Sequence, residues 1–313
     1  MTPPINGRQT ANMVDITHKS NTLRLAVAQA VVSVSKKATV EAIRNGQVPK
    51  GDVFEMSRAA GLLGIKKTPE LLPDCHPLPI EYAHIDYHID GLDIYIEMTV
   101  KTIYKTGVEV EAMHGASIVA LNIYDMLKPI DKGVEIRHIK LLKKLGGKSD
   151  TRQDGKSLTA AVVVCSDSVY KKEKTDEAGK AVSELLKGLD VSIESYTVVP
   201  DEKDHIQKEA ENAAGKQLSM ILFVGGTGLS PRDITPETLD PLLDRTIPGV
   251  EEAIRSYGQQ RTPFAMLSRS KAGMIDKTLV LALPGSTKGA TEGVQAIFPT
   301  VLHLFDIIKG GGH

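Results

Sequence analysis

Hydrophobic and polar positions follow one rhythm in the first half of the chain and a different one in the second half. Apolar residues at positions 25–32 recur at a spacing that predicts an amphipathic helix, with Thr22 as its N-cap. The same kind of pattern predicts a second helix over residues 53–63 and a long one from about residue 112 to residue 127. These three segments make the first half of the chain rich in predicted helix.

A β-hairpin is predicted between those helices. Apolar residues at positions 85, 87 and 89 alternate with polar ones, and the alternation resumes over residues 92–100. The intervening Asp90-Gly91 pair favours a two-residue turn. Helices combined with an antiparallel hairpin predict an α+β sandwich in which helices cover one face of the sheet.

The second half of the chain alternates strands with helices. Apolar runs predict buried strands at residues 158–165, 191–199, 220–224 and 278–283. Helices are predicted after Asp176 and over residues 204–218. This alternation is typical of an α/β domain with a mainly parallel sheet, in which ligands bind beyond the carboxyl ends of the strands.

A change of composition separates the two halves. The stretch from Leu145 to Ser157 is rich in glycine and charge and has no large apolar residue after Leu145. Such a composition is typical of a linker. We therefore predict a first domain at residues 1–149, a linker at residues 150–157 and a second domain at residues 158–313.

Composition and charge exclude several classes of protein. The chain has 313 residues, of which 41% are hydrophobic and 25% charged, and its formal net charge is -1. It therefore has no global basic field that would attract nucleic acid or an anionic membrane. Its two cysteines, Cys75 and Cys165, exclude a disulfide framework and a multi-cysteine zinc site. The polar N-terminal stretch lacks the apolar core of a signal peptide and no apolar run is long enough for a transmembrane helix, so we expect a cytoplasmic protein.

The third strand predicted in the second domain runs into a glycine-rich turn. Gly225, Gly226 and Gly228 let the backbone N–H groups approach an anion closely. Arg232 adds a bidentate donor for an oxyanion, and Asp233 adds a carboxylate that can hold a metal or orient a nucleophile. The alternative is a tight strand-to-helix connection with an exposed ion pair. The ordered string of Gly, Thr, Arg and Asp after a strand favours the functional loop.

Four loops at the carboxyl ends of the predicted strands converge on one crevice. They supply the carboxylates of Asp167, Asp201 and Asp233 and the hydroxyl of Ser286. Oxygen ligands beside a bound phosphate suit Mg²⁺ better than a softer metal. Asp167 and Asp201 can instead cap the helices that follow them. Taken as a set, the carboxylates favour a binding site.

These segments resemble the molybdopterin adenylyltransferases of molybdenum-cofactor biosynthesis. The resemblance covers residues 158–309 and is carried by Cys165-Ser166-Asp167-Ser168, Val199-Pro200-Asp201-Glu202, Gly225 to Glu237, Ile247-Pro248-Gly249, Leu267-Ser268-Arg269 and Leu283-Pro284-Gly285-Ser286. It implies a Mg²⁺-assisted transfer of AMP from ATP to the terminal phosphate of molybdopterin. Asp201 and Asp233 match the two key acidic positions and are the expected catalytic and metal-binding residues. The residues expected to bind substrate are Asp167, Gly225, Gly226, Thr227, Gly228, Arg232, Gly285 and Ser286.

The first domain has a set of charged residues of its own. Glu109 and Glu111 alternate with valines, so both carboxylates are predicted to share one face of an extended segment. Asp125 and Lys128 lie three positions apart near the end of the long predicted helix and share a face. His76 lies among prolines that restrict its backbone. Taken singly, each residue is explained more simply by a solvated surface or a satisfied core position.

Taken together, the segments of the first domain resemble a second family of the same pathway, the cyclic pyranopterin monophosphate synthases. The resemblance covers residues 13–149 and is carried by Lys50-Gly51-Asp52-Val53, Lys66-Lys67-Thr68, Leu72 to Pro79, Thr106 to Met113, Ile123 to Lys128 and Gly146-Gly147-Lys148-Ser149. It implies the conversion of a cyclised GTP derivative into cyclic pyranopterin monophosphate with release of pyrophosphate. The implied catalytic residues are Lys50 and Lys128, with His76, Glu109, Glu111 and Asp125 arranging substrate and protons. The implied substrate-binding residues are Lys66, Lys67, Lys144 and Lys148.

We therefore interpret the chain as a fusion of two enzymes of one cofactor pathway, a ferredoxin-like α+β sandwich followed by a parallel α/β domain. By resemblance, the first domain forms a hexamer with its sites at subunit contacts, and the second has relatives that form trimers. The expected ligands are the cyclised GTP derivative and molybdopterin, with ATP and Mg²⁺ for the second domain and no cofactor firmly implied for the first. A homo-oligomer is expected, and neither nucleic acid nor a membrane is an expected partner.

Two alternatives remain open. In one, the first domain is catalytic and the second is only a pterin-binding carrier. In the other, the chain is a nucleotide-binding scaffold without chemistry. The presence of Asp201, Asp233 and the glycine loop favours two activities.

Overall fold

The computed structural model describes residues 12–147, 155 and 157–310, and the chain divides into two compact units, residues 1–150 and 151–313. The predicted linker at residues 150–157 lies outside the described residues except for Gly155 and Ser157. Gly155 is buried, and its N–H donates to the carbonyl oxygen of Leu189 at 2.8 Å, so this position is packed within the second unit.

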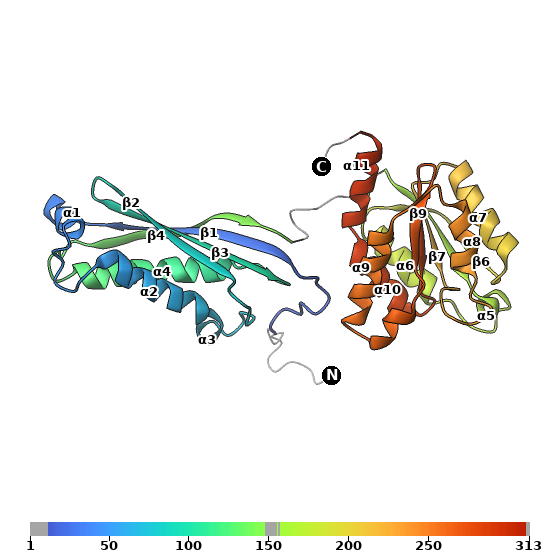
Figure 1. Cartoon of the computed structure of the whole chain (residues 1–313), viewed down its shortest axis with the longest axis horizontal. Helices are drawn as coiled ribbons and strands as arrows, with labels where there is room; N and C mark the ends of the chain where they lie inside the picture. Colours follow the sequence, from blue (N-terminus) through green and yellow to red (C-terminus); the bar gives the residue numbers. More distant parts are fainter. Residues whose placement is uncertain (1–11, 148–154, 156, 311–313) are drawn as a thin grey trace, which may run out of the picture. The chain divides into compact units, whose positions relative to one another are not determined.

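The first unit is a four-stranded antiparallel sheet with helices on one face (Figure 1). Its strands are β1 (Thr22–Ser33), β2 (Tyr82–Asp90), β3 (Asp93–Tyr104) and β4 (Glu135–Leu145), in the order β2-β3-β1-β4. Its helices are α1 (Lys37–Arg44), α2 (Val53–Lys66), α3 (Thr68–Leu71) and α4 (Glu109–Leu127). The core lies between the sheet and the helices α2 and α4. The α+β class predicted for this half of the chain is confirmed.

The helix predicted from Thr22 is wrong, because this segment is the strand β1. Ala26, Ala28 and Ala30 face the core and have no exposed surface, while Val27 and Gln29 between them are half-buried on the other face. A segment with apolar residues on both faces lacks a clear period of two, and its spacing resembles that of a buried helix. Such strands occupy the centre of a sheet, and β1 lies between β3 and β4. The strand β4 is missing from the prediction, because nearly all its residues are exposed and no alternation marks it.

The β2-β3 hairpin is confirmed, with its turn one residue further along than predicted. Asp90 pairs with Asp93, so Gly91 and Leu92 form the turn, and Gly91 takes a positive φ of 58°. The helix predicted over residues 53–63 is confirmed as α2. The predicted long helix is confirmed as α4, which begins at Glu109 rather than at residue 112.

The second unit is a six-stranded sheet in which four neighbouring strands are parallel. Its strands are β5 (Thr159–Cys165), β6 (Ser192–Val199), β7 (Met220–Val224), β8 (Arg245–Thr246), β9 (Lys271–Ile275) and β10 (Thr278–Leu283). Their order is β6-β5-β7-β10-β9-β8, and β9 and β8 run antiparallel to their neighbours at one edge. The mainly parallel α/β class is confirmed, and the four predicted strands are all present.

Helices cover both faces of the second sheet (Figure 1). They are α5 (Asp167–Tyr170), α6 (Ala178–Lys187), α7 (Lys203–Gly215), α8 (Thr235–Leu239), α9 (Pro248–Gln259), α10 (Thr287–Ile297) and α11 (Leu304–Ile308), with 3₁₀ turns η2 (Asp240–Leu242), η3 (Pro263–Leu267) and η4 (Thr300–His303). The side chains of Ala160 and Val162 pack with α6, α9 and α10, whereas those of Ala161 and Val163 pack with α7 and α8. Burial on both faces explains why β5 is apolar throughout.

The carboxyl ends of β5, β6, β7 and β10 lie at the same edge of the second sheet, because these strands are parallel neighbours. The loops that follow them hold the predicted site residues. In the part of the chain that the structure describes, none of the helices combines the length and the apolar character needed to cross a bilayer.

Candidate functional site

A cluster of two lysines and one carboxylate lies at the C-terminal end of α4. The Nζ atom of Lys50 is 2.5 Å from one carboxylate oxygen of Asp125, and the Nζ atom of Lys128 is 2.7 Å from the other. Lys50 also donates to the main-chain carbonyl of Asp125 at 2.9 Å, where the negative end of the helix dipole favours a cation. The structure thus brings together three of the predicted catalytic residues.

The electrostatics of this cluster keep its members charged. Hydrogen bonds from Lys128 and then Lys50 lower the pKa of Asp125 to about 2. The same contact with Asp125 raises the pKa of Lys128. A lysine that acts as a proton-accepting base requires a lowered pKa, and the pKa of Lys128 is shifted the opposite way. The side chains are 39% exposed for Lys50, 46% for Asp125 and 50% for Lys128, so a substrate can reach them.

A second group of predicted residues lies at the N-terminal end of α4. Glu109 accepts a hydrogen bond from Lys144 at 2.9 Å. Burial alone would raise the pKa of Glu109, but this hydrogen bond, a main-chain hydrogen bond and the charges of Lys144 and Arg24 together lower it. Glu111 is buried, and burial followed by the charge of Glu109 raises its pKa. Burial and then the charge of Glu111 raise the pKa of the neighbouring Cys75. His76, next to Cys75, donates from Nε2 to the carbonyl oxygen of Val14 at 2.7 Å.

The expectation that Glu109 and Glu111 share a face of an extended segment is wrong. Both lie in the first turn of α4, where residues two apart point in different directions. Accordingly Glu111 is buried against the core while Glu109 is half-buried. The valines at positions 108 and 110 produced a pattern of period two that the helix overrides.

The predicted residues of the first unit do not meet at one place within a single chain. Glu111 and Asp125 are fourteen positions apart in one helix, which corresponds to about 21 Å along its axis. Lys66 is exposed at the end of α2, and Lys67 pairs with Glu70 at 2.8 Å. Lys148 lies outside the described residues. The predicted residues therefore form two groups, one at each end of α4.

Asp131 is a buried residue of this region that sequence reasoning misses. Its carboxylate accepts hydrogen bonds from the N–H of Ser35 at 2.9 Å, the hydroxyl of Ser35 at 2.5 Å, the hydroxyl of Thr39 at 2.8 Å and the N–H of Gly133 at 2.9 Å. These contacts tie the turn after Lys128 to the segment that leads into α1. The side chains lie about ninety residues apart in the chain, so no local pattern reveals them.

In the second unit, the glycine loop follows β7 as predicted. Gly225 has a φ of +114°, and a Cβ atom there would lie 2.2 Å from the carbonyl oxygen of Cys165 at the end of β5. Gly226 has a φ of +62°, and its Cβ would lie 2.2 Å from the hydroxyl of Thr235. Because main-chain and side-chain atoms approach this closely, both positions need glycine.

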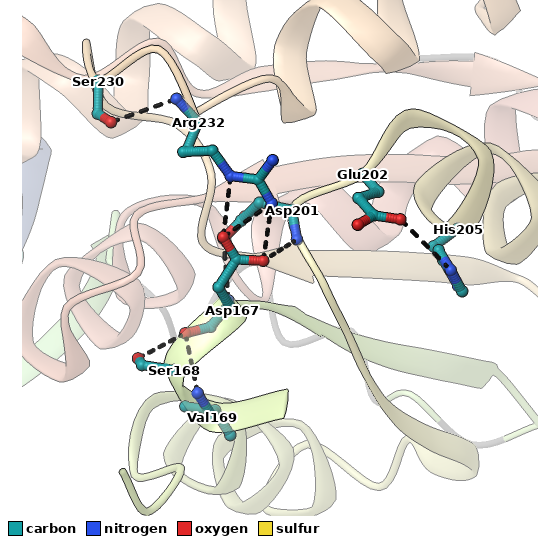
Figure 2. A network of polar contacts seen from close by, with 9 residues as sticks. Asp167, Ser168, Val169, Asp201, Glu202, His205, Ser230 and Arg232 are labelled. Carbon is teal, nitrogen blue, oxygen red and sulfur yellow. Dashed lines mark hydrogen bonds and ion pairs between the residues drawn. The ribbon is translucent and has the colours of Figure 1, made fainter. Parts of the chain in front are cut away.

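Asp167, Asp201 and Arg232 form a compact network at the edge of the sheet (Figure 2). The N–H of Asp167 donates to the carboxylate of Asp201 at 3.1 Å, and the N–H of Asp201 donates to the carboxylate of Asp167 at 3.2 Å. Arg232 donates to both oxygens of Asp167 at 2.9 Å. Although burial alone would raise the pKa of Asp167, the pair with Arg232 lowers it. The guanidinium expected to meet an oxyanion is therefore held by a carboxylate of its own chain.

The alternative that Asp167 and Asp201 cap the following helices is wrong. The α5 cap is Ser166, whose hydroxyl accepts from the N–H of Val169 at 3.4 Å. The N-cap position of α7 is Glu202, and its side chain makes no capping bond. The two aspartates instead bond to each other's main chain across two loops.

Asp201 has the least satisfied carboxylate of the network. Its Oδ1 atom is buried and has no hydrogen-bond partner among the described residues. Burial, together with the charges of Asp167 and Asp233, raises its pKa. Asp233 uses one oxygen to accept the N–H of Ser230 at 2.8 Å. Within the described ranges, no three His, Cys, Asp or Glu side chains are arranged to hold a metal ion. Two carboxylates with a phosphate and waters nevertheless suit Mg²⁺, which rarely needs an all-protein cage.

A cavity of ≈ 370 Å³ adjoins the glycine loop. Four predicted residues line it, namely Thr227, Gly228, Gly285 and Ser286, together with residues of α9, α10 and η3. Ser286 caps α10, because its hydroxyl accepts from the N–H of Gly289 at 3.2 Å. The remaining predicted residues, Asp167, Asp201, Gly225, Gly226, Arg232 and Asp233, do not line this cavity. The glycine loop thus contributes to the wall of a pocket and is also close to the carboxylates of Asp201 and Asp233.

Arg269, like Asp131, is absent from the residues that the sequence predicts for the site. It donates to the main-chain carbonyls of Gly228 and Asp233. It lies in the Leu267-Ser268-Arg269 stretch that carries part of the family resemblance, and that stretch is the signal by which the residue can be found.

Both halves of the chain are similar to known proteins. Residues 13–147 match the MoaC family, and residues 161–303 match the family described as probable molybdopterin binding domain. The chain is 38% identical over 301 residues to a molybdenum cofactor biosynthesis bifunctional protein of Chlorobaculum tepidum, covering 96% of this chain and 96% of that protein. It is 48% identical over 141 residues to a cyclic pyranopterin monophosphate synthase of Clostridium perfringens, covering 44% of this chain and 89% of the relative.

A crystal structure of the molybdopterin biosynthesis enzyme MoaB from Thermus thermophilus shares 40% sequence identity, with 49% of this chain and 97% of that chain covered and a TM-score of 0.47. The similarity to the bifunctional protein extends over almost the whole length of both chains. Each unit also matches the family that its motifs resemble. This chain therefore belongs to the family of bifunctional molybdenum cofactor biosynthesis proteins.

Proposed function

We propose that the first unit converts a cyclised GTP derivative into cyclic pyranopterin monophosphate and releases pyrophosphate. The cluster of Lys50, Asp125 and Lys128 is the observation that supports this activity, because two exposed ammonium groups converge on one carboxylate. A phosphorylated substrate brings the negative charge that can replace Asp125 as their partner. Lys128, with its raised pKa, enters the reaction protonated and acts as a proton donor at Nζ.

We further propose that a second copy of the chain completes this active site in a homo-oligomer, with a hexamer favoured by the resemblance. Because about 21 Å of helix separates Glu111 from Asp125, the half-site with His76, Glu109 and Glu111 does not reach a substrate at Lys128 of the same chain. Two ends of α4 from neighbouring copies can supply the two halves of one site. In that site the buried Glu111, whose pKa is raised, is suited to exchange a proton with the substrate.

Complementation between two inactive variants tests this arrangement. Lys128→Ala disables one half-site and Glu111→Gln the other, and each variant alone is expected to be inactive. When both are co-expressed in equal amounts, about a quarter of the shared sites in the mixed oligomers have two intact halves, so activity returns. Light scattering on the same sample gives the oligomeric state. Absence of recovery in a verified mixed oligomer contradicts a site shared between copies.

For the second unit, we propose transfer of AMP from ATP to the terminal phosphate of molybdopterin. The observation that supports it is the glycine loop, which lines a pocket large enough for a bulky ligand and lies close to the carboxylates of Asp201 and Asp233. A terminal phosphate oxygen attacks the α-phosphorus of ATP and pyrophosphate leaves. The loop N–H groups stabilise the negative charge that develops on the phosphate oxygens.

Asp201 and Asp233 are the residues proposed to hold Mg²⁺. The buried, unpartnered oxygen of Asp201 supports this assignment, since a buried carboxylate oxygen without a donor requires a compensating charge. A bound Mg²⁺ neutralises phosphate charge and orients the chain of phosphates. Arg232 is suited to stabilise the leaving pyrophosphate once that anion replaces Asp167 as its partner.

The purified protein offered each substrate separately, with product masses recorded, tests both activities. Release of pyrophosphate with cyclic pyranopterin monophosphate supports the first, and a mass gain of one AMP on molybdopterin with ATP and Mg²⁺ supports the second. If the second unit binds molybdopterin without any AMP transfer, the pterin-carrier alternative is correct. Binding without turnover in both units supports a scaffold.

We also propose a ferredoxin-like class for the first unit and a cytoplasmic location for the chain. The element order β1, α2, β2, β3, α4, β4 and the strand order β2-β3-β1-β4 support the first. Cys75 and Cys165 support the cytoplasmic location, since both are free thiols, as is usual in a reducing compartment.

A further inference from the structure

Arg269 contacts the glycine loop at several points. Its Nε atom donates to the carbonyl oxygen of Gly228 at 2.8 Å, and its Nη2 atom donates to the carbonyl oxygen of Asp233 at 2.6 Å. Its Nη1 atom pairs with the carboxylate of Glu237, and its own N–H donates to the carbonyl oxygen of Thr227 at 3.1 Å. One residue therefore fixes both ends of the turn from Gly228 to Asp233.

These bonds determine where the Asp233 carboxylate lies. A Cβ atom on Gly228 would be 2.8 Å from the Oδ2 atom of Asp233, so the two ends of the turn are in close contact. That same oxygen accepts the N–H of Ser230 inside the turn. The neighbour of Arg269, Ser268, lines the cavity together with Gly228. A shift of the Arg269 guanidinium would therefore move the carboxylate and the pocket wall together.

A lysine cannot reproduce these contacts. The guanidinium presents five N–H donors in a rigid planar fork, whereas an ammonium group is a single point charge on a flexible stem. Arg269 uses this fork to reach two carbonyls and one carboxylate at once. Its side chain is 31% exposed, so it is held largely inside the unit.

We propose that Arg269 is a positioning residue that sets the geometry of Asp233 and the glycine loop, and so the affinity of the second unit for Mg²⁺ and nucleotide. This inference rests on the proposed AMP transfer. Arg269 acts through the main chain of the loop, which holds the Asp233 carboxylate that would bind Mg²⁺.

Arg269→Lys and Arg269→Gln in the full-length chain test the proposal with three measurements. The Mg²⁺ concentration for half-maximal AMP transfer is expected to rise about tenfold or more, because a hydrogen bond to a charged group is typically worth at least that factor. Binding of Mg·ATP, measured by calorimetry, is expected to weaken by a similar factor. Amide hydrogen exchange is expected to accelerate at Ser230, Asp233 and Thr235, whose N–H groups bond within the loop.

Arg261→Gln is the matched control. Arg261 donates to the carbonyl oxygen of Tyr257 at 2.6 Å and covers the Tyr257 ring. The substitution therefore removes the same charge and a main-chain hydrogen bond, as Arg269→Gln does. It is expected to leave the Mg²⁺ requirement and the loop exchange unchanged. The unfolding temperature of the second unit, measured by calorimetry, shows whether each variant is folded.

The outcomes separate this inference from the proposed function. Unchanged Mg²⁺ requirement and unchanged loop exchange in both Arg269 variants overturn the inference. A loss of turnover without either change also overturns it, because Arg269 would then act on the substrate itself. If the wild type transfers no AMP, the proposed function fails, while Mg·ATP binding and loop exchange still decide the role of Arg269. If the glutamine variant unfolds, the lysine variant decides.

Discussion

The two sites of this chain are built in contrasting ways. At the end of α4, side chains make the site, since Lys50, Asp125 and Lys128 hold one another by charge while remaining substantially exposed. Beyond β7, the main chain makes the site, since Gly225 and Gly226 take positive φ angles and pack against neighbouring loops with no room for a Cβ atom. The first site can rearrange when a substrate replaces its carboxylate. The second is held in shape by its surroundings before any ligand binds.

The contrast predicts that a single side chain is decisive in the first site. Lys128→Ala is expected to abolish pyranopterin formation. Among the described residues, only Lys50 and Lys128 place an ammonium group on Asp125, so the variant keeps just one of the two. The fold is expected to survive, since the side chain is 50% exposed and contributes little core volume. Steady-state turnover and circular dichroism measure the two effects. The control is Lys132→Ala, an exposed lysine nearby that is expected to keep normal turnover. Near-normal turnover of Lys128→Ala removes the residue from the mechanism.

In the second site, the carboxylate that the loop presents is the sensitive group. Asp233→Asn preserves size and deletes the charge, so Mg²⁺-dependent AMP transfer is expected to fall by about a hundredfold or more. The measurement is the rate of AMP transfer at saturating Mg²⁺. Asp276→Asn, an exposed carboxylate in the turn between β9 and β10, is the control and is expected to have no effect. Transfer at the wild-type rate contradicts the assignment of Asp233 to the metal.

The same contrast explains what the sequence predicts well. The glycine loop, β5 and β7 are predictable, because buried parallel strands are continuous apolar runs and a turn with positive φ needs glycine. The family motifs identify Lys50, Asp125 and Lys128, which the fold does bring together. In each case a local pattern carries the physical requirement.

The errors have a common physical cause as well. β1 is apolar on both faces, and such a run does not distinguish a strand from a buried helix. Glu111 lies in a helix whose first residues alternate by chance, and its burial depends on packing against the sheet. Asp131 and Arg269 act through contacts with residues far away in the chain. These features follow from tertiary structure, which single-residue patterns do not encode.

If the main chain makes the second site, a single added methyl group should damage it. Gly225→Ala is expected to destabilise the second unit by roughly 2–5 kcal/mol, because a strained φ adds to a clash with a main-chain carbonyl. Gly225 has a φ of +114°, and an added Cβ atom would lie 2.2 Å from the carbonyl oxygen of Cys165. Gly215→Ala, at the end of α7 with open space around it, is the control and is expected to be neutral or slightly stabilising. Calorimetry of the intact chain compares the two, and equal unfolding temperatures would contradict the prediction.

In the first unit, the loss of a buried carboxylate next to the lysine cluster is expected to lower the free energy of unfolding by a smaller amount. Asp131→Asn is expected to destabilise the first unit by about 1–3 kcal/mol, since the N–H groups of Ser35 and Gly133 lose a charged acceptor. Burial alone would raise the pKa of Asp131, but the bonds from Ser35, Gly133 and Thr39 lower it from its ordinary 3.8 to about 2.

The sign of the pH dependence follows from that shift. A folded-state pKa below the unfolded one means that the carboxylate stabilises the fold above pH 3.8, and that this contribution is lost as the pH falls through about 2. The difference between wild type and Asp131→Asn is therefore expected to be full at neutral pH and to shrink below pH 3.8. Urea unfolding at several pH values measures it. A difference that stays constant into acid would show that the charge of Asp131 is not what stabilises the turn.

The smallest effect is expected from cutting the chain between the two units. The resemblance to the two families implies that the product of the first reaction lacks the dithiolene sulfurs that a separate enzyme adds before adenylylation. The two proposed reactions are then not consecutive, and a direct passage between the sites gives no advantage. A cut between Gln153 and Asp154 leaves Gly155 with the second unit, where it is buried and bonded to Leu189. Each fragment is expected to keep its turnover within about twofold, as independently folded domains do. The assay compares each fragment with the intact protein under the same conditions. A tenfold loss in a correctly folded fragment would mean that its site takes residues or order from the other unit, and the contrast between two separately built sites would then have to be replaced by one shared assembly.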